Sequence, residues 1–327
     1  MSPGKKLWPM LLMFGYWGVI YFLDGKVSNV LISEKTQGLR TDIIIMGLVP
    51  TLLYYGGNKT KPLLQFLLPL FLTLIVYDSQ RYYADLIRGP IHVKEPYDFD
   101  KYFFGIKTAE GILTPNEWFQ KHTVGFLDFI CGIAYIIFVP VYVAVAAYFR
   151  FWLPKTGTKI CHPKSVGYRA PQIMWAFFWV NIIGYSTYYC YAASPPWYTA
   201  LYGFGPARLD VPANLAGCAR FDEFVGMPIF ANWYGRSADV HGAIPSLHIA
   251  YPLISVYWAF RFGSIRFFTT AYYLLMCFSA VYLNHHYILD ILWGSAYAII
   301  VALSLDAFWN NRLKKAGIIV PGSPRDA

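Results

Sequence analysis

Long apolar stretches alternate with polar segments along most of this chain. A bilayer crossing needs about 20 mainly apolar residues, with a range of roughly 17–25. Eight stretches approach or meet that length, so the pattern predicts an all-α fold, a polytopic transmembrane helical bundle of about 6–8 spans. The predicted spans are 7–23, 41–56, 63–79, 124–149, 172–191, 248–262, 266–284 and 287–309.

The two N-terminal stretches differ from the rest in how they could relate to the membrane. The second is short and contains Pro50, so it could be re-entrant or interfacial rather than a full crossing. The first runs into Leu23-Asp24-Gly25 without a small-residue cleavage site, which argues against a signal peptide. We therefore expect N-terminal spans in 1–62, a catalytic transmembrane core in 63–315 and a disordered cytoplasmic tail in 316–327.

Composition agrees with a membrane protein. Charged residues make up 14% of the chain, against about 25% in a typical soluble domain. Aromatic residues reach 19%, and Trp and Tyr collect at membrane interfaces. The 5 cysteines form no CxxC motif, so no metal site is expected. Cys190 and Cys218 bracket one loop and could pair, although unpaired cysteines are the favoured interpretation.

The charge distribution predicts an orientation. If all eight stretches cross, one side holds the N-terminus, 57–62, 150–171, 261–266 and the C-terminus. That side carries 15 of the 27 Lys and Arg residues and two acids, a balance of +13 against −4 on the other side. Cytoplasmic loops carry the Lys and Arg excess, so the basic side is predicted to be cytoplasmic. The net charge of +9 is then a topology signal, and no nucleic acid partner is implied.

Two histidine motifs stand where apolar stretches begin on the opposite face. The segment PSLH ends at His248, and 38 positions later HYILD runs from His286 to Asp290. The motifs are thus predicted on a lumenal or extracytoplasmic face, in the Golgi if the protein is eukaryotic or in the cell membrane if it is bacterial.

These residues suit phosphoryl transfer. His286 could accept the phosphoryl group itself, which splits one difficult displacement into two easier ones. Asp290, four positions on, would share a helix face with His286 and fix its tautomer. His248 could protonate the leaving alkoxide and then deprotonate the acceptor. Ser246 and free N–H groups at the two helix starts could hold phosphate oxygens. Histidines that merely fill polar positions at a membrane edge are the alternative, but the three groups together favour chemistry.

Further polar residues are candidates for substrate binding. His285 would point about 100° away from His286 on a helix, in a structural or substrate-facing position. Asp78, Arg81, Asp85 and Arg88 recur at helical spacing before Gly89-Pro90, so they are expected on one helix face. They could pair among themselves, or Arg81 or Arg88 could bind a phosphate or polyol headgroup. Arg220 could bind phosphate or be a solvated loop residue.

The motifs resemble those of a known superfamily. PSLH and HHYILD are similar to the second and third motifs of the type 2 phosphatidic acid phosphatases. That resemblance implies a six-helix phosphatase-like core with His286 as nucleophile, Asp290 as its orienting acid and His248 as acid and base. The segments YDSQRYY, TPNE, PPWY and ARFD, in the same order, resemble the inositol phosphorylceramide synthase family, and the resemblance covers roughly residues 65–300.

Departures from the phosphatase motifs refine this expectation. The Lys…Arg-Pro element of the first motif is absent, and Ser279-Ala280 stands where Ser-Arg is expected. These losses argue against a general phosphatase and place more weight on Arg81, Arg88 and Arg220 as phosphate ligands.

The resemblance implies a phosphotransferase. No metal or cofactor is expected, because no cluster of carboxylates converges on the histidine motifs. Such an enzyme would move phosphoinositol from phosphatidylinositol to ceramide and release diacylglycerol, so its partners would be a phospholipid donor, a ceramide-like lipid acceptor and the membrane. No protein partner is indicated. A lipid phosphate phosphatase that uses water as acceptor and a non-enzymatic membrane transporter are the alternatives.

Overall fold

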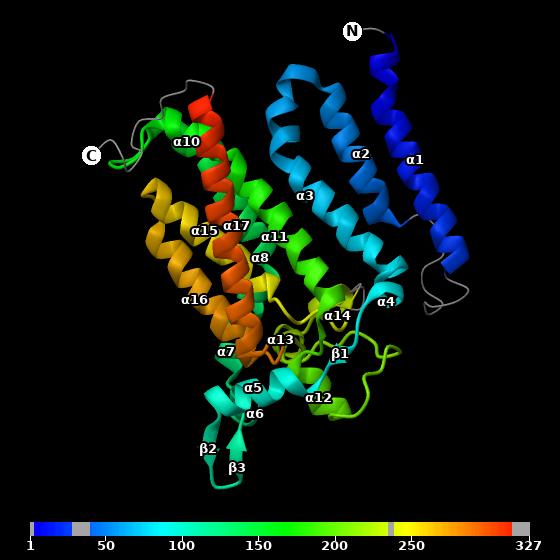
Figure 1. The fold of residues 1–327 in the computed structure, drawn as a ribbon, viewed down its shortest axis with the longest axis vertical. Coiled ribbons are helices and arrows are strands. Elements are labelled where there is room, and N and C mark those ends of the chain that lie inside the picture. The colour runs from blue at the N-terminus through cyan, green and yellow to red at the C-terminus, as the bar shows by residue number, and fades with distance from the viewer. Residues whose placement is uncertain (1–2, 28–39, 235–238, 316–327) are drawn as a thin grey trace. The chain divides into compact units, whose positions relative to one another are not determined.

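The computed structural model describes residues 3–27, 40–234 and 239–315, and the chain is mainly helical (Figure 1). Its packing divides it into two units, Met1–Tyr83 and Ala84–Ala327. The first unit holds α1 (Pro3–Val27), α2 (Thr41–Tyr55), α3 (Lys61–Ser79) and two 3₁₀ turns, Gly57–Lys59 and Gln80–Tyr82.

In the first unit, α2 packs against both α1 and α3. A small buried cluster joins Ile20 of α1 to Ile43 and Met46 of α2 and to Tyr82 after α3. Burial of such side chains contributes about 1.5–3 kcal/mol each in water. In lipid their tight packing, rather than exclusion of water, holds helices together.

The second unit contains the remaining helices. Its long helices α11, α15, α16 and α17 lie side by side, and the short helices α5, α6 and α12 gather at one end of them (Figure 1). The helices are α4 (Ala84–Ile87), α5 (Lys94–Phe104), α6 (Pro115–Lys121), α7 (Gly125–Ile136), α8 (Phe138–Ala147), a π turn (Tyr148–Trp152), α9 (Leu153–Thr156), α10 (Pro163–Arg169), α11 (Pro171–Cys190), α12 (Pro196–Tyr202), α13 (Cys218–Val225), α14 (Ile229–Tyr234), α15 (Leu247–Phe262), α16 (Arg266–Tyr282) and α17 (Ile288–Lys315).

Two small sheets accompany the helices that the sequence predicts. Strand β1 (Ile91–His92) pairs in parallel with β4 (Ala192–Ala193), and β2 (Ile106–Thr108) forms an antiparallel hairpin with β3 (Gly111–Leu113). A bridge from Ala193 to Gly242 extends the first sheet to the segment that leads into PSLH. The strands are too short to show a two-residue alternation in the sequence.

All eight predicted stretches contain helix. Two regions, Lys61–Tyr82 and Ile288–Lys315, are long and apolar enough to cross a membrane by themselves. The predicted span 124–149 is wrong as one continuous helix, because α7 and α8 are bent by 53° at a break next to Ile137. Counted as one broken span, this pair is the third candidate crossing. The predicted disordered tail 316–327 lies outside the described residues.

Candidate active site

His285 and His286 lie in a turn between α16 and α17. Their backbone N–H groups both donate to the Ala280 carbonyl, at 3.1 Å each, and close the end of α16. Asn284 adopts a left-handed conformation with φ of 60°, which Asn tolerates better than most residues. The predicted shared helix face of His286 and Asp290 is therefore wrong, since His286 precedes the first helical residue, Ile288.

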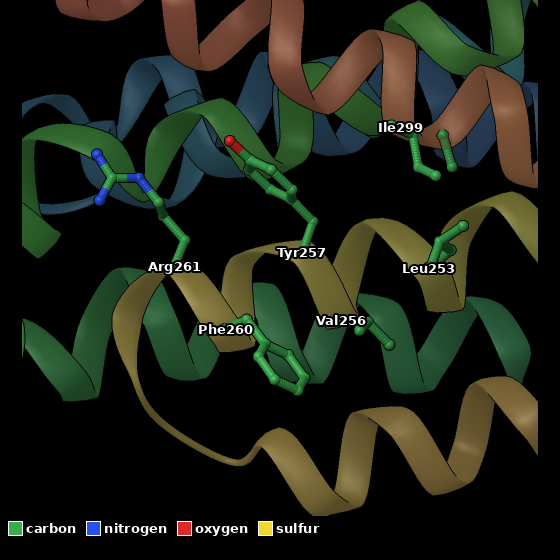
Figure 2. A pocket seen from close by; sticks show the side chains of 7 residues that line it. Leu253, Val256, Tyr257, Phe260, Arg261 and Ile299 are labelled. Carbon is green, nitrogen blue, oxygen red and sulfur yellow. The ribbon is translucent and has the colours of Figure 1, made fainter. Parts of the chain in front are cut away.

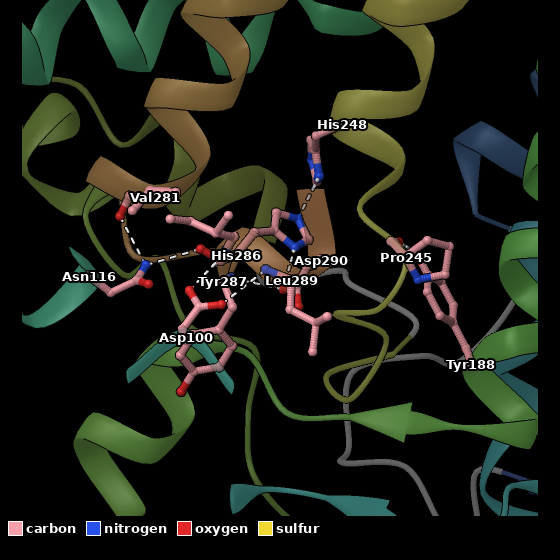
Figure 3. A network of polar contacts seen from close by, with 11 residues as sticks. Asp100, Asn116, Tyr188, Pro245, His248, Val281, His286, Tyr287, Leu289 and Asp290 are labelled. Carbon is pink, nitrogen blue, oxygen red and sulfur yellow. Dashed lines mark hydrogen bonds and ion pairs between the residues drawn. The ribbon is translucent and has the colours of Figure 1, made fainter. Parts of the chain in front are cut away.

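The turn nevertheless brings the three predicted catalytic groups together (Figure 3). His286 Nδ1 lies 3.1 Å from Asp290 Oδ2, and His286 Nε2 lies 3.2 Å from His248 Nδ1. The Tyr287 N–H also donates to Asp290 Oδ2, at 3.0 Å. A carboxylate can only accept, so it selects the tautomer with the proton on Nδ1. His286 Nε2 then keeps its lone pair, as a nucleophile requires.

Burial keeps the His286 ring neutral. The loss of solvation lowers the pKa of His286 from 6.5 to about 4, because a buried charge is poorly stabilised. A neutral ring is nucleophilic over the whole physiological range of pH.

The PSLH segment packs directly on the first turns of α17. The Ser246 N–H donates to the Asp290 carbonyl at 3.0 Å. A Cβ atom on Gly294 would lie 2.2 Å from the Ser246 carbonyl oxygen, so this close approach requires glycine. The two motifs, 38 positions apart, thus share one site.

Ser246 also begins α15. Its Oγ atom is buried and has no hydrogen-bond partner among the described residues. The first N–H groups of any helix lack intrahelical acceptors. The turn before His248 therefore combines a hydroxyl with free backbone donors, a combination that suits an anion.

The start of α17 was also predicted to offer free N–H groups to phosphate. Two of these N–H groups instead donate to a side chain that is distant in the sequence. Asp100 of α5 accepts from Ile288 at 2.7 Å and from Leu289 at 3.0 Å. Phosphate cannot use these donors, so the prediction of an anion site at this helix start is wrong. Burial, with Asp290 adding to it, raises the pKa of Asp100 from 3.8 to about 7, although the two N–H bonds act in the other direction.

Asn116 of α6 holds the same turn from another side. Its side-chain amide donates to the Val281 carbonyl at 3.1 Å and to the His286 carbonyl at 3.0 Å. A capping box of Thr114 and Glu117 starts α6, which orients Asn116. Sequence reasoning missed both holding residues. Asp100 did carry a signal, since it occupies the buried face of the amphipathic helix α5 four residues after buried Pro96.

Aromatic rings form one wall of the site at the break between α7 and α8. Tyr135 stacks on His248 with ring centroids 4.3 Å apart and on His285 at 5.2 Å. Phe138, on the other side of the break, approaches His248 at 4.5 Å. The bend thus lets one interrupted span present two rings to the same histidine.

His285 faces away from the catalytic pair and into the protein. Its Nε2 lies 3.1 Å from the Leu215 carbonyl and 3.2 Å from Cys218 Sγ. Burial lowers the pKa of His285 to about 3. Cys218 is buried and Cys190 exposed, both as free thiols, so the disulfide considered from the sequence is not formed.

The predicted phosphate-binding arginines of this unit are engaged by carboxylates. Arg220 of α13 contacts Asp128 at 2.6 Å and donates to the Gln120 side chain at 2.9 Å. Arg88 contacts Asp85 at 2.6 Å and Asp239 at 3.0 Å. Their role toward substrate stays a prediction.

Asp78 and Arg81 belong to the first unit. Arg81 contacts Asp78 at 2.6 Å, and Arg40 is a second partner of this carboxylate. The prediction that they share a helix face with Asp85 and Arg88 is wrong, because α3 ends at Ser79 and a 3₁₀ turn separates it from α4. The Asp78–Arg81 pair matches the alternative in which these residues pair among themselves. Headgroup binding by Asp78 and Arg81 stays a prediction.

The described ranges 3–27, 40–234 and 239–315 contain no candidate metal centre. No group of three or more His, Cys, Asp or Glu residues there is arranged to hold an ion.

Comparison with known proteins gives one family match and several curated relatives. The PAP2 superfamily matches residues 110–304. A phosphoinositol dihydroceramide synthase of Bacteroides thetaiotaomicron is 33% identical over 277 residues, which is 83% of this chain and 86% of the relative. No solved structure matches the chain significantly.

Fungal proteins are also similar. The inositol phosphorylceramide synthase catalytic subunits of Schizosaccharomyces pombe and Saccharomyces cerevisiae are each 27% identical, over 69% and 72% of this chain. The matches span only 50% and 54% of the fungal proteins. Both histidine motifs fall inside the family match, which covers more than half of the sequence, and the bacterial relative aligns along most of it, so the chain belongs to the PAP2 superfamily.

Proposed function

We propose that this membrane protein transfers phosphoinositol from phosphatidylinositol to the primary hydroxyl of a ceramide-like lipid and releases diacylglycerol. The observation that carries the proposal is the contact of His286 with both His248 and Asp290. The names of the relatives, which are synthases of phosphoinositol-bearing ceramides, support this donor and acceptor.

The first step makes a phosphohistidine. His286 Nε2 attacks phosphorus while the bond from phosphorus to the diacylglycerol oxygen breaks. His248 donates a proton to that oxygen, and Asp290 offsets the positive charge that develops on the His286 ring. In the second step His248 takes the proton of the acceptor hydroxyl, the acceptor oxygen attacks phosphorus and the phosphorus–nitrogen bond breaks.

The observed contact is too short for the reacting state. A phosphorus atom and a leaving oxygen must fit between the two histidines, which now lie at a hydrogen-bond distance of 3.2 Å. Substrate binding must therefore separate His248 from His286. Ser246 and the first N–H groups of α15 would then receive the phosphate oxygens.

The negative charge of the transferring phosphate could be stabilised by two kinds of group. The start of α15 supplies fixed dipoles, which suit a buried site because they need no rearrangement. Arg220 would supply a full charge only by exchanging Asp128 or Gln120 for substrate. Arg88 and Arg81 would likewise have to give up their carboxylate partners.

Transfer instead of hydrolysis requires exclusion of water from the phosphohistidine. The aromatic wall that Tyr135 and Phe138 form against His248 supports this exclusion. We further propose that the site opens on the extracytoplasmic face, as the Lys and Arg distribution favours.

The test is a product analysis. Purified protein in detergent micelles would be supplied with phosphatidylinositol, with or without ceramide, and diacylglycerol, inositol phosphate and inositol phosphorylceramide would be measured. We expect equal amounts of diacylglycerol and inositol phosphorylceramide, and neither from the His286→Ala variant. The exposed His122→Ala is the matched control and should retain activity. Inositol phosphate formed at the same rate with and without ceramide would contradict transfer.

A further inference from the structure

A cavity of about 260 Å³ lies between α15 and α17, away from the histidines (Figure 2). Leu253, Val256 and Phe260 of α15 and Ala298 and Ile299 of α17 line it, together with Tyr257 and Arg261. Phe260 is 53% exposed and Ile299 46% exposed, so the groove opens on the outside of the helices. In a membrane protein that surface faces lipid.

The groove has one apolar end and one polar end. Leu253 lies near the catalytic end of α15, whereas Arg261 is in its last turn. Thirteen residues separate His248 from Arg261, which corresponds to about 20 Å along a helix. A lipid headgroup bound at Arg261 would thus lie at the end of α15 opposite His248. The acyl chain of that lipid would extend toward Leu253.

Positive charge is in excess at the polar end. Asp306 of α17 accepts from Arg261 and from the buried Arg169, at 3.1 Å in each case, and also from the Tyr257 hydroxyl at 3.2 Å. Arg266 lies over the Phe260 ring at 5.3 Å and has no carboxylate partner among the described residues. Arg169 and Arg261 contact Asp306, and Arg266 adds a third positive charge beside Phe260, so these four groups carry a net charge of +2.

The Arg169 Nε atom is itself buried without a hydrogen-bond partner among the described residues. Ionisable groups at the end of a membrane helix are costly unless they are paired or reach a polar ligand. A negatively charged headgroup would offset the positive charge that Asp306 does not neutralise. The groove would then hold one acyl chain of the same lipid.

We propose that this groove binds an anionic phospholipid that is distinct from the reacting lipids, with its headgroup at Arg261 and Arg266 and one chain between α15 and α17. The groove is smaller than the roughly 300–1,000 Å³ of pockets that enclose whole ligands, which fits part of a single chain. The arginine end lies on the side predicted to be cytoplasmic, where anionic lipids are enriched. Substrate headgroups, in contrast, must reach His286 at the other end.

Photocrosslinking tests this proposal without depending on turnover. The full-length protein would be placed in phosphatidylcholine nanodiscs with a trace of phosphatidylglycerol or of phosphatidylcholine that carries the same photoreactive acyl chain. Crosslinked peptides would be mapped by mass spectrometry. We expect the phosphatidylglycerol probe to label residues 253–260 and 298–299 at least fivefold more than the phosphatidylcholine probe.

Two matched pairs of variants locate the site. Ile299→Trp fills the groove and should reduce labelling several-fold, whereas Ile300→Trp, the neighbouring exposed isoleucine about 100° around the helix, should not. Arg266→Gln should remove most of the preference for phosphatidylglycerol, whereas the exposed Arg312→Gln should leave it intact.

The contrary results are equally specific. Equal labelling by the two probes, or equal effects of Ile299→Trp and Ile300→Trp, would overturn the proposal. Thermal unfolding midpoints close to wild type would confirm that each variant is folded. Because the probes are not converted, these results are separate from any failure of the transferase reaction.

Discussion

In the proposed mechanism the His286 ring attacks through Nε2, since Nδ1 faces the buried Asp290 carboxylate at 3.1 Å. Formation of a phosphorus–nitrogen bond would place positive charge on the ring. A carboxylate in a site of low polarity stabilises such a charge strongly. We therefore propose that Asp290 contributes both orientation and charge.

Replacement of Asp290 by Asn tests this contribution. Asp290→Asn keeps the shape but removes the charge, and the amide can favour the wrong tautomer of His286. We expect kcat to fall by roughly 10²–10⁴-fold, with a smaller effect on KM. Initial rates of ceramide-dependent transfer measure this. The exposed Asp98→Asn serves as control, and an Asp290→Asn rate within about twofold of wild type would contradict the assigned role.

His285 predicts a dependence of stability on pH. Its pKa is about 3 in the folded protein and 6.5 when unperturbed. As the pH falls below 6.5, His285 binds a proton in the unfolded chain but stays neutral in the folded protein. Its contribution therefore lowers the free energy of unfolding by about 1.4 kcal/mol per pH unit. Above pH 6.5 its contribution is constant. Asp100 acts oppositely, because its raised pKa lets the folded protein hold a proton between 3.8 and about 7.

Thermal unfolding midpoints between pH 7.5 and pH 5 would reveal the histidine contribution. His285→Gln removes the titrating ring, so its midpoint should decrease less steeply with acidification than that of wild type. Identical slopes for the two proteins would mean that His285 is not held neutral by burial.

The contact among the three proposed catalytic residues could be predicted from sequence because the chemistry that they would perform restricts residue type and spacing. Asp100 could not be predicted in its role, since its partners are backbone N–H groups 188 and 189 positions away. Any residue supplies such groups, so no side-chain pattern marks them. The pairing of Arg220 could not be predicted either, because its partner Asp128, at 2.6 Å, is 92 positions away in the sequence.

At the scale of elements, the start of α17 is held by two short helices outside the long ones. Asp100 of α5 caps the helix, and Asn116 of α6 fixes the carbonyl of His286. In the proposed mechanism these contacts set the position of His286 relative to His248. We therefore propose that Asp100 is a positioning residue whose effect passes through His286.

Substitution of Asp100 should reduce catalysis in a graded way. Asp100→Ala removes both acceptors, and we expect a loss of about 1–3 kcal/mol in stability and a decrease in kcat that exceeds the change in KM. Asp100→Asn keeps one good acceptor and resembles the protonated acid, so it should recover much of the rate. The exposed Asp98→Ala on the same helix is the control. Equal losses in Asp100→Asn and Asp100→Ala would argue against positioning.

Most helices could be predicted from the lengths of the apolar runs. The break between α7 and α8 does have a signal in the sequence, because Pro140 cannot donate to the Ile136 carbonyl and its ring crowds that carbonyl, directly at the break. In contrast, helical spacing from Asp78 to Arg88 gave no sign of the 3₁₀ turn that ends α3. Tertiary packing decides that interruption, and the local pattern does not record it.

At the scale of the whole molecule, the family match lies within the second unit, together with every residue of the histidine site. The remaining expectation concerns the membrane sidedness of this unit. Cys190 offers a natural probe, because it is an exposed free thiol at the end of α11, next to the loop predicted to be extracytoplasmic.

Labelling of intact cells with a membrane-impermeant maleimide tests the sidedness. We expect modification of Cys190 from outside in a bacterial cell, or from the lumenal side of sealed vesicles, and none in Cys190→Ser. A cysteine introduced as Lys159→Cys should react only after permeabilisation. The reverse pattern would mean that the charge-based orientation is inverted.

The proposed mechanism requires a covalent phosphoinositol intermediate on His286. Incubation of the protein with ³²P-labelled phosphatidylinositol in the absence of ceramide, followed by rapid denaturation, measures it directly. We expect acid-labile label on the peptide that contains His286, chased into inositol phosphorylceramide when ceramide is added, and no label on His286→Ala. Ceramide-dependent transfer at an undiminished rate in His286→Ala would contradict it.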